Sequence, residues 1–577
     1  MSTSIPYFWE VARNKYPEND KRHNNLTTTL KTMVSNLRRM CKTNEYNVFT
    51  IGMGYLYEHI RPSIVILLAL FMEPSVRAQF DKYSSNQFNL EWHKMFFDNL
   101  MKYNVPDIAY WFFLKVPYFY RNNLDARRQL MSSMLDYMTE KWPSDKIFNE
   151  KSFIFTTMSS YPVYSLAYHN NSNKEILGKV CKLIRKICPF VNYRNPNISN
   201  IRWKAGEKLK VCFVSESLSG DTSVLRDRIG IILNLPKEQF DVYYATFSNM
   251  ELVKNRNPVA MSLYKKMKDR YIHLSNSMDD ARRKLASHNF HIIVYPDIGM
   301  KITQTFLAYS RIAPIQINTW GHSDTSGIDT VDYYITSKYF EVDNVSEMQS
   351  HYSEKAIALP SFGTYYYSPV SMFANGELKT RQDYGLLQDD HVYWCMQTFY
   401  KFNEAFEDII AQIIRSDDKA IILLSVAIPF CRSHLARIIN KIGKENVNKI
   451  KFYPAKNKLD FYSLIKLSDV VLDPTPFGGC NSSLEAFDLG VPVVSMPSQF
   501  INGRFTYGFY QKMGIQDCLV STADEYVEIA LKLANNYDFR NSIVAKINKN
   551  KNLLFEEAES VKDWTNCLLD LGEKHIR

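Results

Sequence analysis

The stretch from Leu467 to Pro497 constrains the fold more than any other part of the chain. It begins with the apolar run 470–472, two β-branched valines and a leucine, which is typical of a buried parallel strand. Asp473 and the prolines and glycines after it then end the strand, residues 481–483 are ones that start helices, and the run 493–496 predicts a further strand. Strand, turn, helix and strand in this order form one unit of a parallel α/β sheet.

The helix predicted to begin at Asn481 has its N-terminus just past the carboxyl end of a parallel strand. Free backbone N–H groups and the positive end of the helix dipole favour an anion at such a place. Asn481, Ser482 and Ser483 add side-chain donors, and Glu485 is placed to accept hydrogen bonds from two ribose hydroxyls. A diphosphate beside a ribose suggests a nucleotide, whereas a capped helix in any α/β domain would show the same residues.

The alternation of strand and helix patterns extends over most of the chain. One series runs from Lys208 to about Tyr367, and a second starts near Val392. Such alternation predicts two parallel, doubly wound sheets, with ligands in the crevice at the carboxyl ends of the strands. We expect the last helix, around 561–571, to cross back to the first series.

The first 205 residues show a different pattern. Apolar residues recur at helical spacing in 26–40, 88–103 and 122–142, without the period of about 34 residues that marks a tetratricopeptide array. We therefore predict an all-α domain over 1–205, an N-terminal Rossmann-like half over 206–375, and a nucleotide-binding C-terminal half with terminal helices over 376–577.

Composition limits the class of protein. Of 577 residues, 46% are hydrophobic, and the net charge of +10 is spread along the chain, which favours anionic ligands such as sugar nucleotides. The chain has no dense run of Lys and Arg, so nucleic-acid binding is disfavoured. Its nine cysteines form no Cys-x-x-Cys pair or Cys/His cluster, which indicates neither a disulfide framework nor a zinc site.

The sequence also predicts a soluble, cytoplasmic protein. The first residues lack the basic-then-apolar pattern of a signal peptide. The most apolar run, 63–72, is far shorter than the roughly 20 residues that a membrane helix needs, and it is better interpreted as a buried helix. We expect no membrane span.

The residues around Asn481 are similar to a known family. Together with the Pro-Phe-Gly turn of 476–478, Asn481 and Glu485 resemble the donor-nucleotide loop of glycosyltransferase family 41. That family holds the O-GlcNAc transferases and the bacterial adhesin N-glucosyltransferases. The bacterial branch has Asn and, four places later, usually Asp where this chain has Glu485. The O-GlcNAc branch has a His where Cys480 stands, so the local pattern is more similar to the bacterial branch.

Further motifs are similar to the family in order and spacing. They are YPDIGM at 295–300, APIQ at 313–316, WGHSDTSGIDTVDYYIT at 320–336, and YSEK at 352–355 followed by LP at 359–360. Several motifs in order are more specific than any one of them, and together they cover roughly 208–533. The resemblance implies an α/β GT-B fold of two Rossmann-like halves, a UDP-sugar donor and a protein acceptor.

The resemblance also assigns roles to single residues. Thr398 and Lys401 match a Thr and a Lys of the bacterial branch, and a Lys there lies against the diphosphate and stabilises the leaving nucleotide. Phe461 stands where relatives have a His or Tyr beside the base, so it flanks the uracil or is a core aromatic. His322 and 325–327 resemble the loop on the sugar and acceptor side, although an ordinary loop histidine would look the same.

The general base is where the chain departs from the family. Inversion at the sugar needs the acceptor proton to be removed on the face opposite the leaving group. Relatives have histidines in the loop after the first strand, whereas 215–230 contains none and Asp221 stands at the approximate position, followed by Arg226 and Arg228. Asp221 is either a base or the cap of the following helix.

These patterns predict an inverting transferase that moves a hexose from a UDP-sugar to a protein Asn, or to Ser or Thr. Its predicted catalytic residues are Asp221, His322 and Lys401, and we expect no metal and no cofactor beyond the donor. The chain shows no metal-binding Asp-x-Asp triad, and the pairs 389–390 and 417–418 are expected in solvated loops. Two alternatives stay open: a non-catalytic sugar-nucleotide or glycan-binding partner of a glycosyltransferase, and a transferase acting on a glycan or small molecule.

Overall fold

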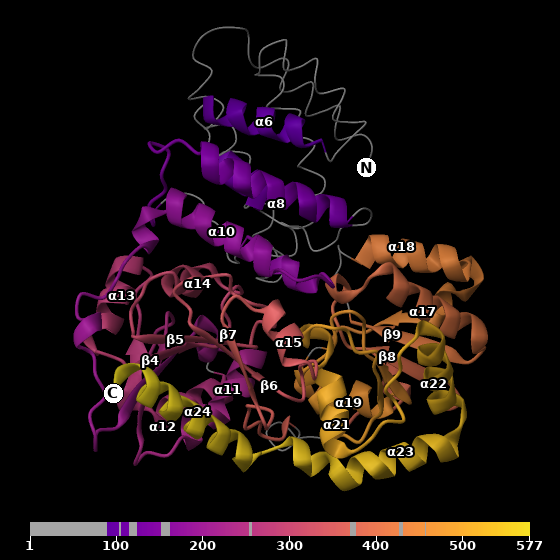
Figure 1. Cartoon of the computed structure of the whole chain (residues 1–577). Helices are drawn as coiled ribbons and strands as arrows, with labels where there is room; N and C mark the ends of the chain where they lie inside the picture. Colours follow the sequence, from indigo (N-terminus) through magenta and orange to yellow (C-terminus); the bar gives the residue numbers. More distant parts are fainter. Residues whose placement is uncertain are drawn as a thin grey trace. The chain divides into compact units, whose positions relative to one another are not determined.

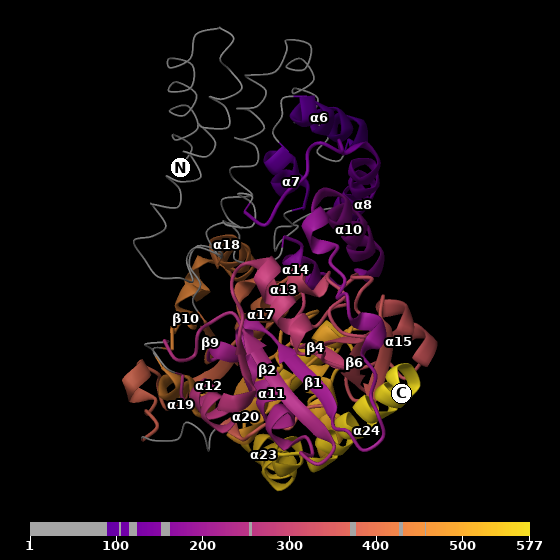
Figure 2. The same cartoon turned by 90° about the vertical axis from the view of Figure 1, so that its left-hand side faces the viewer.

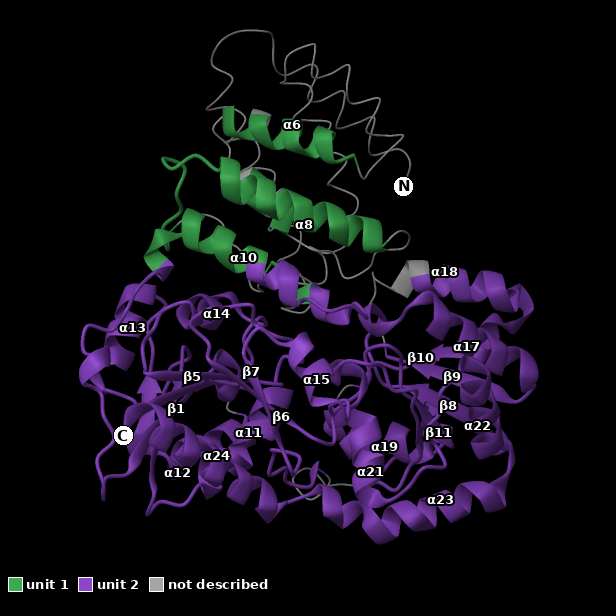
Figure 3. Cartoon of the chain, in the orientation of Figure 1, with its two compact units in different colours: residues 1–165, 179–190 green, residues 166–178, 191–577 purple. Residues whose placement is uncertain are grey.

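The computed structural model describes residues 89–102, 106–114, 124–151, 162–252, 257–369, 377–425, 431–455 and 457–577. The helices expected at 26–40 and 63–72 lie outside these residues. The chain forms two compact units, one of residues 1–165 and 179–190 and the other of 166–178 and 191–577 (Figure 3). The domain boundaries predicted near 205 and 375 stay predictions.

The first unit is helical where it is described. It contains α6 (Leu90–Lys102), α7 (Pro106–Leu114), α8 (Leu124–Lys141) and most of α10 (Lys174–Ile187) (Figure 1). Helices α6 and α8 occupy two of the segments in which apolar spacing predicted helices. Their apolar faces meet around Phe97, which is fully buried and whose ring packs against Tyr137 and Trp142 at centroid distances of 5.9 and 5.7 Å.

The second unit holds two sheets, and the first has seven parallel strands in the order β3-β2-β1-β4-β5-β6-β7. Its strands are β1 (Leu209–Val214), β2 (Phe240–Thr246), β3 (Tyr271–His273), β4 (Ile292–Tyr295), β5 (Ile315–Thr319), β6 (Tyr333–Ser337) and β7 (Lys355–Leu359). Helices α11 (Ser223–Asn234) and α12 (Pro258–Lys266) cover one face, and α13 (Met278–Ser287) and α14 (Ile302–Ala308) cover the other (Figures 1 and 2). Helix α15 (Val345–His351) precedes β7. The strand order reverses between β1 and β4, and a ligand crevice is expected there.

The second sheet has five parallel strands in the order β10-β9-β8-β11-β12. They are β8 (His391–Cys395), β9 (Ala420–Leu424), β10 (Ile450–Phe452), β11 (Val470–Leu472) and β12 (Val493–Val494). The helices of this half are α17 (Glu404–Ser416), α18 (Cys431–Ile442), α19 (Lys458–Leu467), α20 (Asn481–Asp488), α21 (Phe505–Met513), α22 (Ala523–Asn535) and α23 (Tyr537–Asn550). The order reverses between β8 and β11, so the loops after these two strands meet at one edge.

The last helix, α24 (Ala558–Ile576), returns to the first half as expected from the sequence. Its buried face, which includes Trp564, Leu568 and Leu571, belongs to the same hydrophobic core as β1, β4 and β5. The Trp564 indole donates a hydrogen bond of 2.8 Å to the carbonyl of Gly363. None of the helices in the described part of the chain is long and apolar enough to cross a membrane.

Candidate functional site

Lys401 lies directly after the first strand of the second half, at the end of the short 3-10 helix η7 (Phe399–Lys401) that follows β8. Its Nζ donates a hydrogen bond of 2.7 Å to the Gly478 carbonyl and lies 4.4 Å from the centroid of the Phe477 ring. Burial lowers the pKa of Lys401 to about 8, and the nearby Asp473 carboxylate opposes that shift. The ammonium therefore contacts the turn that leads into α20.

That turn is closed around the carboxylate of Asp473, which follows β11. Asp473 accepts hydrogen bonds from the Gly479 N–H at 2.6 Å and the Ser495 hydroxyl at 2.8 Å. A Cβ at Gly478 would lie 2.8 Å from Asp473 Oδ2, so the turn has no room for a side chain at that position. We expected Asp473 only to end a strand, but it organises the loop in front of α20.

Helix α20 begins with the three residues predicted to bind an anion. Asn481 Nδ2 donates to Asp227 at 3.1 Å, and the Tyr366 hydroxyl donates to Asn481 Oδ1. The Ser482 hydroxyl accepts from Gln397, and the Ser483 and Thr506 hydroxyls are 2.8 Å apart. The N-cap residue Cys480 makes no side-chain cap hydrogen bond. The start of α20 thus presents backbone N–H groups without a side-chain cap, beside Lys401.

Glu485 is buried in a cluster of cations. It is 3.1 Å from Arg226 Nη1 and 3.1 Å from Lys458 Nζ, and the Tyr462 hydroxyl is 3.5 Å from its Oε1. Arg226 comes from α11 in the first half, so this ion pair joins the two halves. The carboxylate that we predicted for the ribose is therefore occupied by protein cations in this structure.

Asp221 forms an ion pair with the same Arg226 guanidinium. Asp221 is not the cap of α11, because the N-cap is Thr222, whose hydroxyl accepts from Leu225 N at 3.1 Å. The alternative role of Asp221 as a helix cap is thus wrong. Arg226 thus pairs with both Asp221 and Glu485, and these ion pairs link the first half to the second.

His322 lies in the loop after β5 and is buried. Burial lowers its pKa to about 4, so the imidazole is neutral near pH 7. Its ring contacts Gly299, where an added Cβ would lie 2.7 Å from His322 Cδ2. The 325–327 part of the loop is held by Glu354, which accepts from the Thr325 hydroxyl at 2.5 Å and from Ser326 N at 2.9 Å.

The two remaining predicted residues flank β8. Thr398 is the N-cap of η7, and its carbonyl accepts from Lys401 N at 3.0 Å. Phe461, on α19, packs edge-on against Trp394 with ring centroids 5.1 Å apart, and Lys458 Nζ lies 5.3 Å from its centroid. Phe461 packs against the core of the second half, while its predicted contact with uracil stays a prediction.

Helix α11 supplies further charged groups, to which the sequence pattern assigned no role. Asp227 accepts from Asn481, and burial raises its pKa to about 6. Arg228 is fully buried, and burial lowers its pKa to about 10. Its guanidinium lies 4.1 Å from the centroid of Trp320 and donates to Thr319 and Gly363. The available signal was a run of three charged residues, 226–228, inside an otherwise apolar helix.

One pair expected in solvated loops is partly buried. Asp417 is 5% exposed and accepts hydrogen bonds from the Tyr393 hydroxyl at 2.6 Å and from His391 Nδ1 at 2.8 Å. The expectation of solvation was therefore wrong for Asp417, which holds the start of β8 against α17.

Residues 370–564 match the sequence model of the family described as Glycosyl transferase family 41. The resemblance to family 41 is confirmed. A solved structure of a Thermobaculum terrenum O-GlcNAc transferase mutant aligns with 96% of this chain and 100% of its own, with a TM-score of 0.61 at 15% identity. That likeness confirms the predicted GT-B fold.

Both branches of the family are among the similar sequences. The UDP-glucose:protein N-beta-glucosyltransferase of Actinobacillus pleuropneumoniae serotype 7 is 24% identical over 284 residues, which are 48% of this chain and 44% of that protein. The probable UDP-N-acetylglucosamine–peptide N-acetylglucosaminyltransferase SEC of Arabidopsis thaliana is 25% identical over 230 residues, 39% of this chain and 23% of that protein. The chain thus matches less than half the length of these relatives.

Proposed function

We propose that this protein is an inverting glycosyltransferase that moves a hexose from a UDP-sugar to a side chain of an acceptor protein, Asn or else Ser or Thr. The observation that carries the proposal is the position of Lys401, whose ammonium is held at the Gly478 carbonyl in front of the uncapped N-terminus of α20. The named activities of the similar sequences support the UDP-sugar and the protein acceptor.

In the proposed reaction the donor diphosphate lies between Lys401 and the first N–H groups of α20. Both groups stabilise the negative charge that develops on the departing UDP, so we propose transfer without a metal ion. Thr398 and the hydroxyls of Ser482 and Ser483 add donors at the same edge of the sheet. The acceptor proton passes to Asp221 or to the neutral imidazole of His322.

A second candidate function is a sugar-nucleotide or glycan-binding partner without catalysis. Two observations favour it: the loop 215–230 has no histidine, and Asp221 and Glu485 both pair with Arg226. Such a protein would bind UDP and transfer nothing.

The main proposal also includes a cytoplasmic location and no nucleic-acid partner. The seven free cysteines of the described residues support a reducing compartment.

The test is UDP release from purified protein with a panel of UDP-sugars, with and without an Asn-x-Ser/Thr peptide. Peptide-dependent release from one sugar, lost in Lys401→Ala and unchanged by EDTA, is the expected result. UDP binding without turnover for any sugar and acceptor, glycans included, would move the protein to the second candidate. Turnover that EDTA abolishes would overturn the proposed independence of metal.

A further inference from the structure

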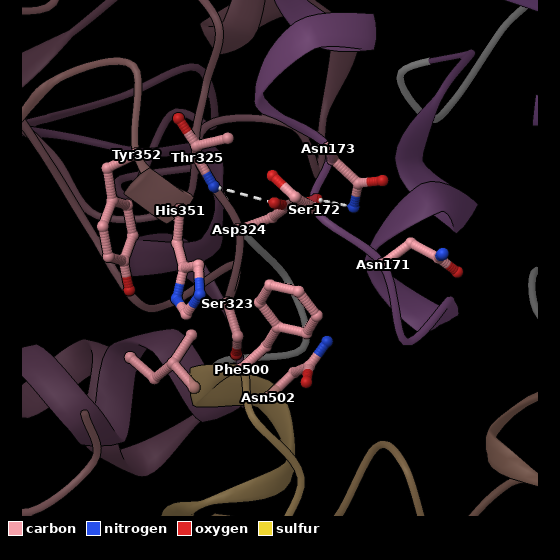
Figure 4. A pocket seen from close by; sticks show the side chains of 11 residues that line it. Asn171, Ser172, Asn173, Ser323, Asp324, Thr325, His351, Tyr352, Phe500 and Asn502 are labelled. Carbon is pink, nitrogen blue, oxygen red and sulfur yellow. Dashed lines mark hydrogen bonds between the residues drawn. The ribbon is translucent and has the colours of Figure 1, made fainter. Parts of the chain in front are cut away.

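A pocket lies beside the candidate site, where four stretches of chain converge (Figure 4). Its walls are residues 171–173, 323–325, 351–352 and 500–502, and the space between them, part of which is open to solvent, is about 330 Å³. We call it the junction pocket. We propose that the junction pocket binds a neutral pyranose ring, as the sugar unit of a glycan.

The polar groups of the junction pocket are held in place before any ligand arrives. Asn173 Nδ2 donates to Asp324 Oδ2 at 2.7 Å, and Asp324 Oδ1 accepts from Thr325 N at 2.9 Å. Asn502 Nδ2 donates to the Ala167 carbonyl at 2.6 Å. Fixed donors and acceptors lose little entropy on binding, which is how a small polar ligand gains affinity.

Asn502 carries an unsatisfied acceptor in the wall of the pocket. Its side chain is 5% exposed, and within the described residues its Oδ1 has no hydrogen-bond partner. Buried polar atoms nearly always have a partner, and an acceptor needs an O–H or N–H group. Because that oxygen is itself buried, a sugar hydroxyl meets the need once the Asn502 side chain turns toward the pocket.

The charges of the pocket exclude an anion. No lysine or arginine is among the described residues that line it, and the Asp324 carboxylate would repel a phosphate or carboxylate. Burial lowers the pKa of His351, which therefore stays neutral at pH 7. The pocket thus differs in chemistry from the cationic site around Lys401 and suits an uncharged ligand.

The shape of the pocket favours a compact ring over an extended peptide. A peptide in β-conformation pairs with groups set in a row along a strand edge, whereas the residues that line this pocket come from four separate segments (Figure 4). The half-buried Phe500 ring, which packs against His351 with centroids 4.6 Å apart, adds an apolar surface. A pyranose has hydroxyls around its rim and C–H groups on its faces, so it matches both features.

The junction pocket is connected to the turn in front of α20. The Asn502 carbonyl accepts a hydrogen bond of 2.9 Å from Gly478 N, and the Gly478 carbonyl accepts from Lys401. A bound sugar would therefore lie next to the proposed donor site. The inference does not require the transfer reaction, because a glycan-binding partner would use the pocket in the same way.

The test is saturation-transfer NMR on the full chain with methyl glycosides of glucose, galactose and N-acetylglucosamine. Saturating UDP is present so that a glycoside cannot report on the donor site. We expect transfer to at least one glycoside, with about tenfold weaker binding in Phe500→Ala and in Asn502→Leu. Tyr537→Ala, which removes an exposed aromatic on α23, is the matched control and keeps wild-type binding.

Three outcomes would overturn the proposal. One is no saturation transfer from the wild-type protein to any glycoside. Another is unchanged transfer in Phe500→Ala, a variant that removes no side-chain hydrogen bond and whose folding is checked by thermal unfolding. The third is an Asn-x-Ser peptide that binds only through Phe500 while the glycosides do not bind, because the pocket would then belong to a peptide acceptor. UDP affinity, measured separately, tests the proposed function and not this inference.

Discussion

At the scale of single residues, the ammonium of Lys401 is the group on which nucleotide binding depends most. Lys401→Met keeps the length of the side chain and removes the charge, so we expect UDP affinity to fall about 10- to 100-fold, the loss of one charge-assisted hydrogen bond. Isothermal titration calorimetry with UDP measures it. Lys562→Met, at an exposed position of α24, is the control. Equal UDP affinity of the Lys401 variant and wild type would contradict the assignment.

The pKa of about 8 at Lys401 predicts a pH dependence. Burial favours the neutral amine, so the cation that binds the diphosphate is present below about pH 8 and is lost as pH rises through that value. UDP affinity should therefore be constant from pH 6.5 to 7.5 and fall above about pH 8, approaching tenfold per pH unit. Titrations of wild type and Lys401→Met at several pH values test this. A profile of the same slope in both proteins would assign the dependence to another group.

The proposed catalytic role of Asp221 can be tested apart from helix capping, because Thr222 and not Asp221 caps α11. We expect Asp221→Asn to slow transfer about 100-fold or more while UDP affinity stays the same, since a general base acts on the acceptor and not on the nucleotide. Thr222→Ala should instead cost about 1 kcal/mol of stability. Single-turnover rates and thermal unfolding distinguish the two. A normal rate in Asp221→Asn would leave His322 as the candidate base.

At the scale of elements, the turn between β11 and α20 depends on the absence of a side chain at Gly478. In Gly478→Ala the new Cβ would lie 2.8 Å from Asp473 Oδ2, and the turn must move. We expect a loss of about 1–3 kcal/mol in stability and weaker UDP binding, measured by urea unfolding and calorimetry. Gly178→Ala in α10 is the control, because nothing lies within 4 Å of an added Cβ there. Similar behaviour of the two variants would contradict this account.

The elements could be predicted from local sequence, but the pairings between them could not. The apolar run before Asp473 and the Asn-Ser-Ser start after it are local signals, and β11 and α20 lie where those signals place them. The ion pair of Arg226 with Glu485 joins residues 259 positions apart, and no spacing rule links them. The burial of Asp417 likewise depends on His391 and Tyr393, which reach it only after β8 and α17 pack. Charge and polarity indicate where a residue tends to lie, whereas its partner is decided by tertiary structure.

At the scale of the whole molecule, α24 connects the end of the chain to the first half. Trp564 is fully buried and bonds to Gly363, while Asp563 accepts a hydrogen bond of 2.9 Å from Ser361 N. The C-terminal helix therefore completes the core of a sheet whose strands are far away in sequence. Substitutions that remove these contacts of α24 should lower the free energy of unfolding of the first half and leave the turn around Lys401 unchanged.

Trp564→Ala tests whether α24 stabilises the first half without affecting the turn around Lys401. Removing the indole leaves a cavity in the core of the first sheet and takes one donor from the Gly363 carbonyl. We therefore expect the free energy of unfolding of the first half to fall by about 3–5 kcal/mol. Urea denaturation followed by far-ultraviolet circular dichroism measures it, and Tyr537→Ala, an exposed aromatic, should change stability by less than about 0.5 kcal/mol. In the absence of urea the variant should still bind UDP, because Lys401 and the start of α20 lie outside the hydrophobic core that contains Trp564. Wild-type stability of Trp564→Ala would show that α24 does not contribute to the core of the first sheet. A folded Trp564→Ala protein that no longer binds UDP would show that the two halves form the nucleotide site together.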